Sequence, residues 1–512
     1  MSKKYKLNPK RTFITELFIV VLLALAQVVL LILYAWQLFK AVAIIEIASR
    51  VLSVFVVIYV INKRENNSYK LAWVVPILLF PAFGGMLYVF CQGRISIFAF
   101  RKKILETEKH FHQSVKDMPD ASGDFETENP DYKPRTEYLK SLGFPMYSGT
   151  DAKYYPMGED VFDDIISALK SAKEYIFIEY FIIHEGYFWN SILDILTEKA
   201  SEGVDVRIIY DGVGSVTTLP RKYNKTLQAL GIKCKVFNRF VPVISTMQNN
   251  RDHRKVLSID GKVAFTGGVN LADEYINKIE KFGKWKDSAI RVTGSAAQGF
   301  SLIFLRNWNI INKEYEDPSK YIKSTTGDNG KGYFQPYCDN PFDSDEVGRN
   351  VYLDMISRAK KSIYIMTPYL IMDEELDCAI KLAARSGIDV RIITPHKADK
   401  KFVYMVTRSS YAELMESGVK IYEYTPGFIH SKNVLVDGEC AVVGSINFDY
   451  RSLYLHFECG QLFYSSPALE ELNDDFEKTF ELSQKITFDD CRKNSGISRI
   501  ATQLLKVFTP LF

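Results

Sequence analysis

An internal repeat constrains the fold of this chain more than any other feature of its sequence. Two portions about 180 residues apart share the same succession of helical and β-rich segments. Residues 203–209 (GVDVRII) match residues 387–393 (GIDVRII), and each run follows a helical stretch and a strand-like segment. A repeat on this scale indicates one folded unit present twice. Strands that alternate with helices predict two α/β lobes, each a mixed sheet flanked by helices.

Each copy of the repeat ends in the same spaced pattern of polar and small residues. Counted from a histidine, a lysine follows at the second position, an aspartate at the seventh, small residues at the fourteenth and fifteenth, and an asparagine at the seventeenth. The two sets are His253, Lys255, Asp260, Gly267, Gly268 and Asn270, and His430, Lys432, Asp437, Gly444, Ser445 and Asn447. Agreement at every position is not expected by chance.

This spacing predicts a β-hairpin that gathers phosphate-binding groups. Residues two apart on a strand share a face, so the histidine and lysine project together. The Asp-Gly pair suits the turn, and the return strand brings Gly268 and Asn270, or Ser445 and Asn447, beside them. An imidazole, a cation, an amide and close backbone N–H groups suit a tetrahedral phosphate. As turn residues, Asp260 and Asp437 also have a sufficient structural explanation.

Two facing histidines permit two-step phosphoryl transfer without a metal or another cofactor. One imidazole attacks phosphorus, and the other protonates the leaving alkoxide and later deprotonates the incoming alcohol. Each imidazole needs an acceptor on its second nitrogen. Asp287 and Glu458, 34 and 28 residues after their histidines, are the predicted orienting groups. The predicted catalytic residues are His253, Lys255, Asp260, His430, Lys432 and Asp437.

The duplicated HxKxxxxD-GG/GS-N pattern resembles the phospholipase D superfamily. The apolar N-terminal region with Gly84-Gly85, the run from Asn250 to Lys255 and the C-terminal ending resemble its bacterial cardiolipin synthases. This resemblance implies transfer of a phosphatidyl group from one phosphatidylglycerol to another, with release of glycerol. It also implies that His253 is the nucleophile and His430 the acid/base. Transfer to phosphatidylethanolamine, ethanolamine or water stays open, because the motif binds phosphate and does not define the alcohol.

The first 93 residues predict a membrane region of two to three transmembrane helices. Residues 17–36 form an apolar run with Gln27 as the strongly polar member, about the length that spans a bilayer core. Residues 41–61 contain Glu46 and Arg50 at helical i,i+4 spacing, and residues 71–91 contain two prolines. These runs predict a multi-pass membrane protein, and their flanking charges do not define its orientation. The resemblance to the bacterial family implies the bacterial cell membrane and membrane lipids as partners. It also implies a cytoplasmic catalytic domain, because that family's phosphatidylglycerol is made at the cytoplasmic leaflet.

Charge and cysteine content argue against a nucleic-acid-binding enzyme and a cysteine zinc protein. The 64 basic and 61 acidic residues nearly balance, which argues against a phosphodiesterase that binds nucleic acid. The seven cysteines contain no CxxC pair, so a cysteine zinc ribbon is excluded and a reducing compartment is favoured. A silent membrane adaptor is disfavoured because both motifs are intact. The oligomeric state is left open.

The resulting domain organisation has six parts. The prediction is a membrane region at 1–93, a juxtamembrane connector at 94–134, a first lobe at 135–316, an inter-lobe linker at 317–346, a second lobe at 347–490 and an amphipathic tail at 491–512. The predicted architecture is therefore α/β, with N-terminal transmembrane helices followed by two pseudo-twofold-related phospholipase D-like lobes.

Overall fold

The structure is a computed structural model that forms two compact units. It describes residues 21–32, 40–63, 66–91, 94–116, 118–240, 246–312, 314–322, 330–343, 345–492, 502 and 505–509. One unit consists of residues 1–99, 240–249 and 503–512, and the other consists of residues 100–239 and 250–502. Each is described by itself below.

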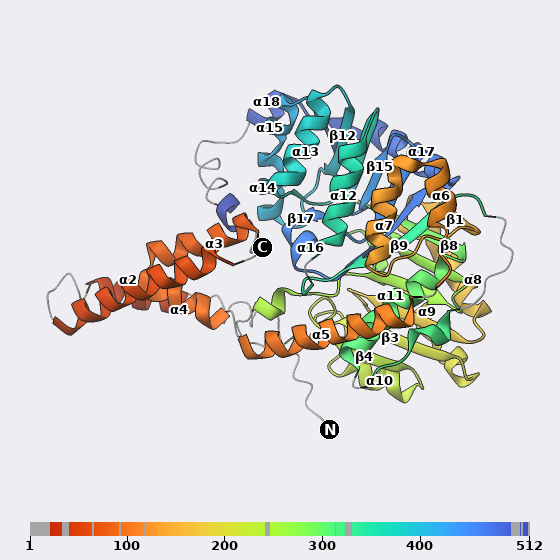
Figure 1. The fold of residues 1–512 in the computed structure, drawn as a ribbon, viewed down its shortest axis with the longest axis horizontal. Helices are drawn as coiled ribbons and strands as arrows, with labels where there is room; N and C mark the ends of the chain where they lie inside the picture. Colours follow the sequence, from red (N-terminus) through yellow and green to blue (C-terminus); the bar gives the residue numbers. More distant parts are fainter. Residues whose placement is uncertain are drawn as a thin grey trace. The chain divides into compact units, whose positions relative to one another are not determined.

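The N-terminal unit is helical. Residues 21–32 are helical, followed by α2 (Lys40–Ile61), α3 (Asn67–Leu79) and α4 (Pro81–Cys91), shown in red to orange in Figure 1. The rings of Trp73 and Tyr88 meet edge to face at 5.3 Å, and Ser53 Oγ donates to the Pro81 carbonyl at 2.7 Å. A Cβ at Gly84 would lie 2.6 Å from the Pro76 carbonyl oxygen, so glycine permits the close approach of α3 and α4.

The prediction of transmembrane helices in this region is wrong. Among the residues that the structure describes, no helix is both long enough and apolar enough to cross a bilayer. The predicted span at 71–91 is divided into α3 and α4 at Phe80, because Pro81 disfavours a helical residue before it. In α2, Glu46 and Arg50 form the predicted ion pair, which places two charges within one helix. Of the predicted span at 17–36, residues 17–20 and 33–36 lie outside the described residues.

The larger unit contains two mixed sheets, one for each lobe. The seven-stranded sheet of the first lobe has the order β1 (Thr150–Tyr155), β8 (Ala289–Gly294), β6 (Val263–Gly267), β5 (Lys255–Ile259), β2 (Tyr175–Tyr180), β3 (Asp205–Asp211) and β4 (Lys233–Phe237). The eight-stranded sheet of the second lobe has the order β19 (Ser483–Lys485), β13 (Lys420–Tyr424), β12 (Asp389–Pro395), β10 (Ser362–Met366), β15 (Asn433–Val436), β16 (Cys440–Gly444), β18 (Glu458–Tyr464) and β9 (Tyr333–Asp339).

Helices cover both sheets, as Figure 1 shows. In the connector and first lobe they are α5 (Arg94–Ser114), α6 (Ser122–Glu128), η1 (Pro130–Tyr132), α7 (Lys133–Ser141), α8 (Gly158–Ser171), α9 (Tyr187–Ser201), α10 (Tyr223–Ala229), η3 (Asp273–Ile276), α11 (Ala297–Ile311) and η4 (Pro318–Tyr321). The short helix η2 (Thr246–Asn249) belongs to the N-terminal unit. In the second lobe they are α12 (Val347–Arg358), α13 (Glu374–Arg385), α14 (Lys401–Ser409), α15 (Tyr411–Glu416), α16 (Tyr450–Tyr454), α17 (Ala468–Glu481) and α18 (Phe488–Arg492).

The two lobes repeat one topology. In each sheet three parallel strands, β2-β3-β4 or β10-β12-β13, continue into three antiparallel strands, β5-β6-β8 or β15-β16-β18. The central strand β2 is buried on both faces, since every one of its residues is buried. The two α/β lobes and the predicted hairpins are therefore present, with turns at Asp260 and Asp437, which both have positive φ.

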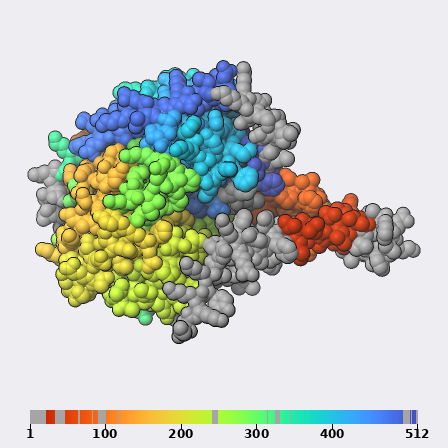
Figure 2. Space-filling view, turned by 180° about the vertical axis from the view of Figure 1, so that it is seen from behind, coloured from red at the N-terminus to blue at the C-terminus, as the bar shows by residue number. Residues whose placement is uncertain are grey.

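The lobes pack through the faces of their central strands. Strands β6 and β8 lie against β16 and β18, and one apolar core contains Val256, Ile290, Val434 and Leu462. Figure 2 shows the first lobe, in yellow to green, in broad contact with the second, in cyan to blue. A two-stranded parallel sheet also crosses between them, pairing β14 (Gly427–Ile429) with β7 (Lys284–Lys286).

Several segments outside the predicted lobes take part in these cores. Strand β9 lies within the predicted linker and forms an edge of the second sheet. Phe125 on α6 lies within the predicted connector and is buried in the shared core. Most of the predicted tail at 491–512 lies outside the described residues, although 505–508 are helical.

Candidate active site

His253 reaches the lobe interface just before β5. Its neighbour Asp252 forms a parallel bridge with Phe457 of the second lobe, and His253 N donates to the Phe457 carbonyl at 2.9 Å. His253 itself precedes the strand. The backbone of the second lobe therefore holds the histidine of the first.

His430 is held in the corresponding way from the other side. It follows β14, which pairs with β7 of the first lobe, and His430 N donates to the Lys286 carbonyl at 2.7 Å. Both histidines are thus placed by main-chain pairing across the interface. Such pairing fixes their position more tightly than side-chain contacts alone would.

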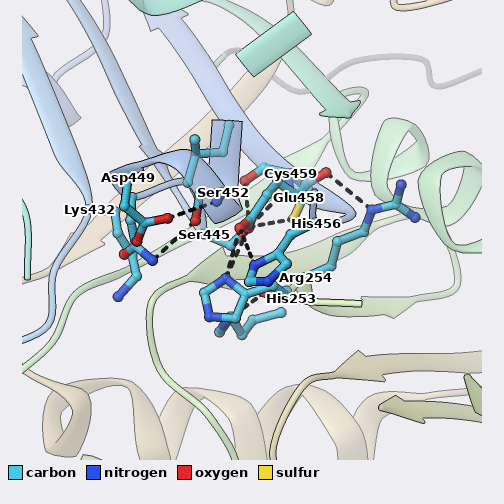
Figure 3. A network of polar contacts seen from close by, with 12 residues as sticks. His253, Arg254, Lys432, Ser445, Asp449, Ser452, His456, Glu458 and Cys459 are labelled. Atoms are coloured by element: carbon cyan, nitrogen blue, oxygen red, sulfur yellow. Dashed lines mark hydrogen bonds and ion pairs between the residues drawn. The ribbon is translucent and has the colours of Figure 1, made fainter. Parts of the chain in front are cut away.

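The two carboxylates cross between the lobes. Glu458 begins β18 in the second lobe, and its Oε1 lies 2.9 Å from Nδ1 of His253 in the first lobe (Figure 3). Asp287 follows β7 in the first lobe, and its Oδ2 lies 2.6 Å from Nδ1 of His430 in the second. Both acids are fully buried. Each acid therefore contacts the histidine of the opposite repeat and not the one that precedes it in sequence.

Two lysines lie beside the histidines and are almost completely buried. The Lys255 ammonium donates to the His253 carbonyl at 2.5 Å, and the Lys432 ammonium donates to the His430 carbonyl. Burial lowers the pKa of Lys255 to about 8 and that of Lys432 to about 7. A bound phosphate would stabilise the charged ammonium groups and raise both pKa values.

Burial also keeps both imidazoles neutral. It lowers the pKa of His253 and of His430 well below the ordinary value, and the charges of Lys255 and Lys432 add to this effect. The ring of Phe181 lies 5.0 Å from that of His253, and the ring of Trp285 lies 5.6 Å from that of His430. A neutral imidazole that donates through Nδ1 has its lone pair on Nε2, the form that a nucleophile or a base requires.

Asp287 and His430 can share one proton. Burial raises the pKa of its carboxyl to about 7, although the charges of Lys432 and Lys255 oppose this shift. Because the two groups are in contact, they titrate as a pair, and a proton on the pair is available near neutral pH. This is the requirement for alternate donation to a leaving alkoxide and acceptance from an alcohol.

Gly268 and Ser445, the small residues fifteen positions after each histidine, contact the two buried carboxylates. An ideal Cβ at Gly268 would lie 2.0 Å from Asp287 Oδ1, so a side chain there would displace the carboxylate. Ser445 Oγ donates to Glu458 Oε2 and accepts from Cys459 N at 3.0 Å. Phosphate binding was predicted for these positions, and the structure places both against carboxylates.

Both motif asparagines form hydrogen bonds to neighbouring protein groups. Asn270 Oδ1 accepts from Ile182 N at 3.1 Å, and Asn447 Nδ2 donates to Ser452 Oγ at 3.1 Å. The buried Oδ1 of Asn447 has no hydrogen-bond partner among the described residues. Both amides are almost completely buried.

The structure does not bring the motif aspartates to the histidines. Asp260 accepts hydrogen bonds from the N–H groups of Lys173, Glu174 and Tyr175 at 2.8–2.9 Å, where β2 begins. Asp437 makes the same three contacts before β10, at 2.7–2.8 Å. The five residues of β5 separate Asp260 from His253, which is roughly 16 Å of strand.

Arg254, between the histidine and the lysine of the first motif, was not predicted as a site residue. It is buried and donates to the Glu458 carbonyl at 3.1 Å, to Glu179 at 3.2 Å and to the Asp339 carbonyl at 3.0 Å. Figure 3 shows it reaching from the first lobe to the strand that carries Glu458. Glu179 is fully buried. The periodicity of the sequence gives no sign of this network.

His456, which the motif spacing does not single out, lies beside the site. Its ring centroid is 5.5 Å from that of His253, and its Nδ1 is 3.6 Å from Glu458 Oε1. Burial lowers its pKa to about 3. Donor atoms of His253, His456 and Glu458 lie within 4.8 Å of one another, so these three could hold a metal ion. The sequence feature that could have identified His456 is its position two residues before Glu458.

Known proteins share this repeat. The family profile "Cardiolipin synthase, PLD-like domain" matches residues 165–290 and 352–480, and "Phospholipase_D-nuclease N-terminal" matches residues 51–92. The chain is 34% identical over 481 residues to a cardiolipin synthase of Alkalihalophilus pseudofirmus, with 90% of this chain and 92% of the relative covered. It is 40% identical over 458 residues to an uncharacterised protein of Streptococcus mutans, with 89% of this chain and 99% of the relative covered.

A solved structure shares the fold. The phosphatidylserine synthase of Haemophilus influenzae matches with a TM-score of 0.56 at 15% sequence identity, over 73% of this chain and 97% of that chain. At this identity the likeness concerns the fold alone.

Proposed function

The chain belongs to the phospholipase D-like cardiolipin synthase family, and from this premise we propose that it condenses two phosphatidylglycerol molecules into cardiolipin and glycerol. The observation that carries the proposal is the pair of crossed histidine–carboxylate contacts beside two buried lysines. This arrangement supplies a nucleophile, a proton-transfer group and two cations around one phosphate.

In the first step, Nε2 of His253 attacks phosphorus of the donor lipid. The bond from phosphorus to the glycerol oxygen breaks, and the His430–Asp287 pair gives its proton to that oxygen. Glu458 accepts the Nδ1 hydrogen of His253 and stabilises the positive charge that develops on the ring. Lys255 and Lys432 offset the charge on the phosphate oxygens.

In the second step, a hydroxyl of the acceptor lipid gives its proton to His430 and attacks phosphorus. The phosphorus–nitrogen bond to His253 breaks, which regenerates the neutral imidazole. The first step exchanges a phosphorus–oxygen bond for a phosphorus–nitrogen bond, and the second reverses this. Because the two steps together exchange one phosphodiester for another, binding and positioning supply most of the acceleration. The surrounding apolar rings and the buried lysines favour an alcohol over bulk water because little solvent reaches the phosphorus.

Both substrates are lipids, so we propose that the enzyme works at the bacterial cell membrane with its catalytic unit on the cytoplasmic side. Protease accessibility in intact spheroplasts compared with lysed ones tests the side. Protection of the catalytic unit in intact spheroplasts is expected, and cleavage there would contradict the assignment.

Reconstitution with phosphatidylglycerol vesicles tests the reaction itself. The expected products are cardiolipin and glycerol in equal amounts, followed by mass spectrometry. His253→Asn should abolish both products, while His184→Asn, a half-exposed histidine of the same lobe, should leave them unchanged. Phosphatidic acid in place of cardiolipin would instead show a hydrolase, and no lipid product would refute the proposal.

A further inference from the structure

Two cations lie beyond the predicted motif, on the second lobe. Lys400 precedes α14, and its ammonium lies 5.3 Å from the centroid of the Tyr369 ring. Arg451 lies in α16, whose first turn is capped by Asp449. Tyr369 precedes β11 (Leu370–Ile371), which pairs with β17 (Phe448–Asp449) directly after Asn447. Both cations are therefore attached to elements that meet beside the second-lobe motif.

Neither cation is neutralised by an ion pair among the described residues. Asp399, next to Lys400, accepts from Tyr369 Oη and from the Lys400 backbone N–H. Asp449 accepts from Ser452 N at 2.8 Å as the helix cap. Burial lowers the pKa of Arg451, because a charged group is less stable away from water. A bound anion would offset this loss of stability.

The charge of Lys400 acts on both catalytic histidines, and the charge of Arg451 acts on their neighbour His456. The charge of Lys400 is among those that lower the pKa of His253 and of His430. The charge of Arg451 lowers the pKa of His456, which contacts His253. Both cations also act on Asp449, whose carboxyl pKa is raised by burial. Figure 3 shows Asp449 beside Lys432, on the opposite side of Glu458 from Arg254.

The reacting phosphate already has Lys255 and Lys432 at its side, so these further cations suit a second anion. An acceptor phosphatidylglycerol brings such an anion, because its own phosphodiester enters together with the hydroxyl that reacts. Two phosphodiesters held near each other repel unless cations lie between or around them. Lysine as a point charge and arginine as a planar donor are the usual partners of phosphate.

We propose that Lys400 and Arg451 form an acceptor subsite that binds the phosphodiester of the incoming lipid and so selects an anionic alcohol. This inference rests on the proposed phosphatidyl transfer and concerns the acceptor alone. An uncharged alcohol that reacts at the same phosphatidyl-histidine gains no binding from the cations of the subsite. Loss of Lys400 therefore lowers transfer to an anionic acceptor more than transfer to a neutral one.

A competition between acceptors tests the subsite. Phosphatidylglycerol vesicles with added ethanol yield cardiolipin from the anionic acceptor and phosphatidylethanol from the neutral one. Lys400→Gln is expected to lower the ratio of cardiolipin to phosphatidylethanol about tenfold, the size of one lost charged hydrogen bond. Arg451→Lys, which keeps the charge but loses the planar fork, should lower it by a smaller factor. Lys401→Gln, the exposed neighbour, is the matched control and should leave the ratio unchanged.

An equal fall of both products in Lys400→Gln would overturn the inference, because it would place Lys400 on the reacting phosphate. An unchanged ratio in Lys400→Gln would overturn it as well.

A second pair of acceptors separates this result from the proposed function. Transfer to glycerol 3-phosphate and to glycerol compares an anionic with a neutral acceptor of the same backbone. If the wild type makes phosphatidylethanol but no cardiolipin, the proposed function fails, and this soluble pair still tests the subsite. A lower preference for glycerol 3-phosphate in Lys400→Gln supports the subsite, and an unaltered preference contradicts it.

Discussion

Removing the charge of Glu458 should impair the histidine of the opposite repeat. Glu458→Gln keeps the shape of the side chain but loses the anion that faces His253 Nδ1 at 2.9 and 3.1 Å. A hydrogen bond to a buried charged group contributes about 1.5–3 kcal/mol. Loss of that amount from the transition state corresponds to a rate about 10- to 160-fold lower. The step affected is formation of phosphohistidine, because His253 becomes positive there.

Rapid-quench trapping of the covalent intermediate measures this step directly. With radiolabelled phosphatidylglycerol, Glu458→Gln should form labelled protein 10- to 160-fold more slowly than the wild type by the same conversion, about 1.36 kcal/mol per tenfold. Glu439→Gln on the exposed hairpin of the same lobe is the control and should not alter the rate. Formation at the wild-type rate in Glu458→Gln would refute the crossed arrangement. The proton resonance of the His253 Nδ1–H group gives a second test. The crossed arrangement would be refuted if Asp287→Asn removed this resonance and Glu458→Gln did not.

Three further predictions follow from other contacts. Asp260→Asn should lower the free energy of unfolding by about 2–4 kcal/mol, measured by urea denaturation, while the folded fraction stays active, because it loses the charge that holds three N–H groups. Gly268→Ala should abolish activity in a folded protein, since its Cβ displaces Asp287, whereas Gly123→Ala, which meets nothing within 4 Å, should be silent; an active Gly268→Ala would contradict the packing. His456 has its pKa lowered to about 3 in the folded chain, so the unfolded chain binds more protons below pH 6.5 and stability falls as pH falls. From pH 6.5 to 5 the wild type should lose about 2 kcal/mol more than His456→Gln, and equal losses would contradict a neutral buried imidazole.

Much of the catalytic fold could be predicted from local patterns. The hairpin of Asp260 and its counterpart at Asp437 follow from fixed spacing and from Asp-Gly turns, both of which are local in sequence. The repeat itself implied two lobes with one topology. These features depend on residues within about twenty positions of one another.

The crossing of the acids could not be read from spacing. Asp287 follows His253 by 34 residues and Glu458 follows His430 by 28, which suggests pairs within a repeat. The contacts instead join opposite repeats, because β14 pairs with β7 and Asp252 bridges Phe457. Pairing of this kind depends on how the lobes pack, which no single repeat encodes.

The N-terminal helical unit shows that apolar composition alone does not predict where a helix ends. The apolar run at 71–91 predicted one span, but Pro81 divides it into α3 and α4, which pack through Trp73 and Tyr88. Apolar content cannot distinguish one long helix from two short ones. Likewise Arg254 carries no periodic signal, since its partners Glu458, Glu179 and Asp339 lie far away in the sequence.

The location of the covalent intermediate tests the account most directly. Wild-type protein mixed with phosphatidylglycerol, quenched in alkali and digested, can be searched by mass spectrometry for a phosphatidyl adduct, or its deacylated glycerophosphoryl form, on the peptide that contains His253. The account predicts the adduct on His253, at a yield that falls in Glu458→Gln and is absent in His253→Asn. An adduct on His430 with His253 unmodified would contradict the assignment of the nucleophile.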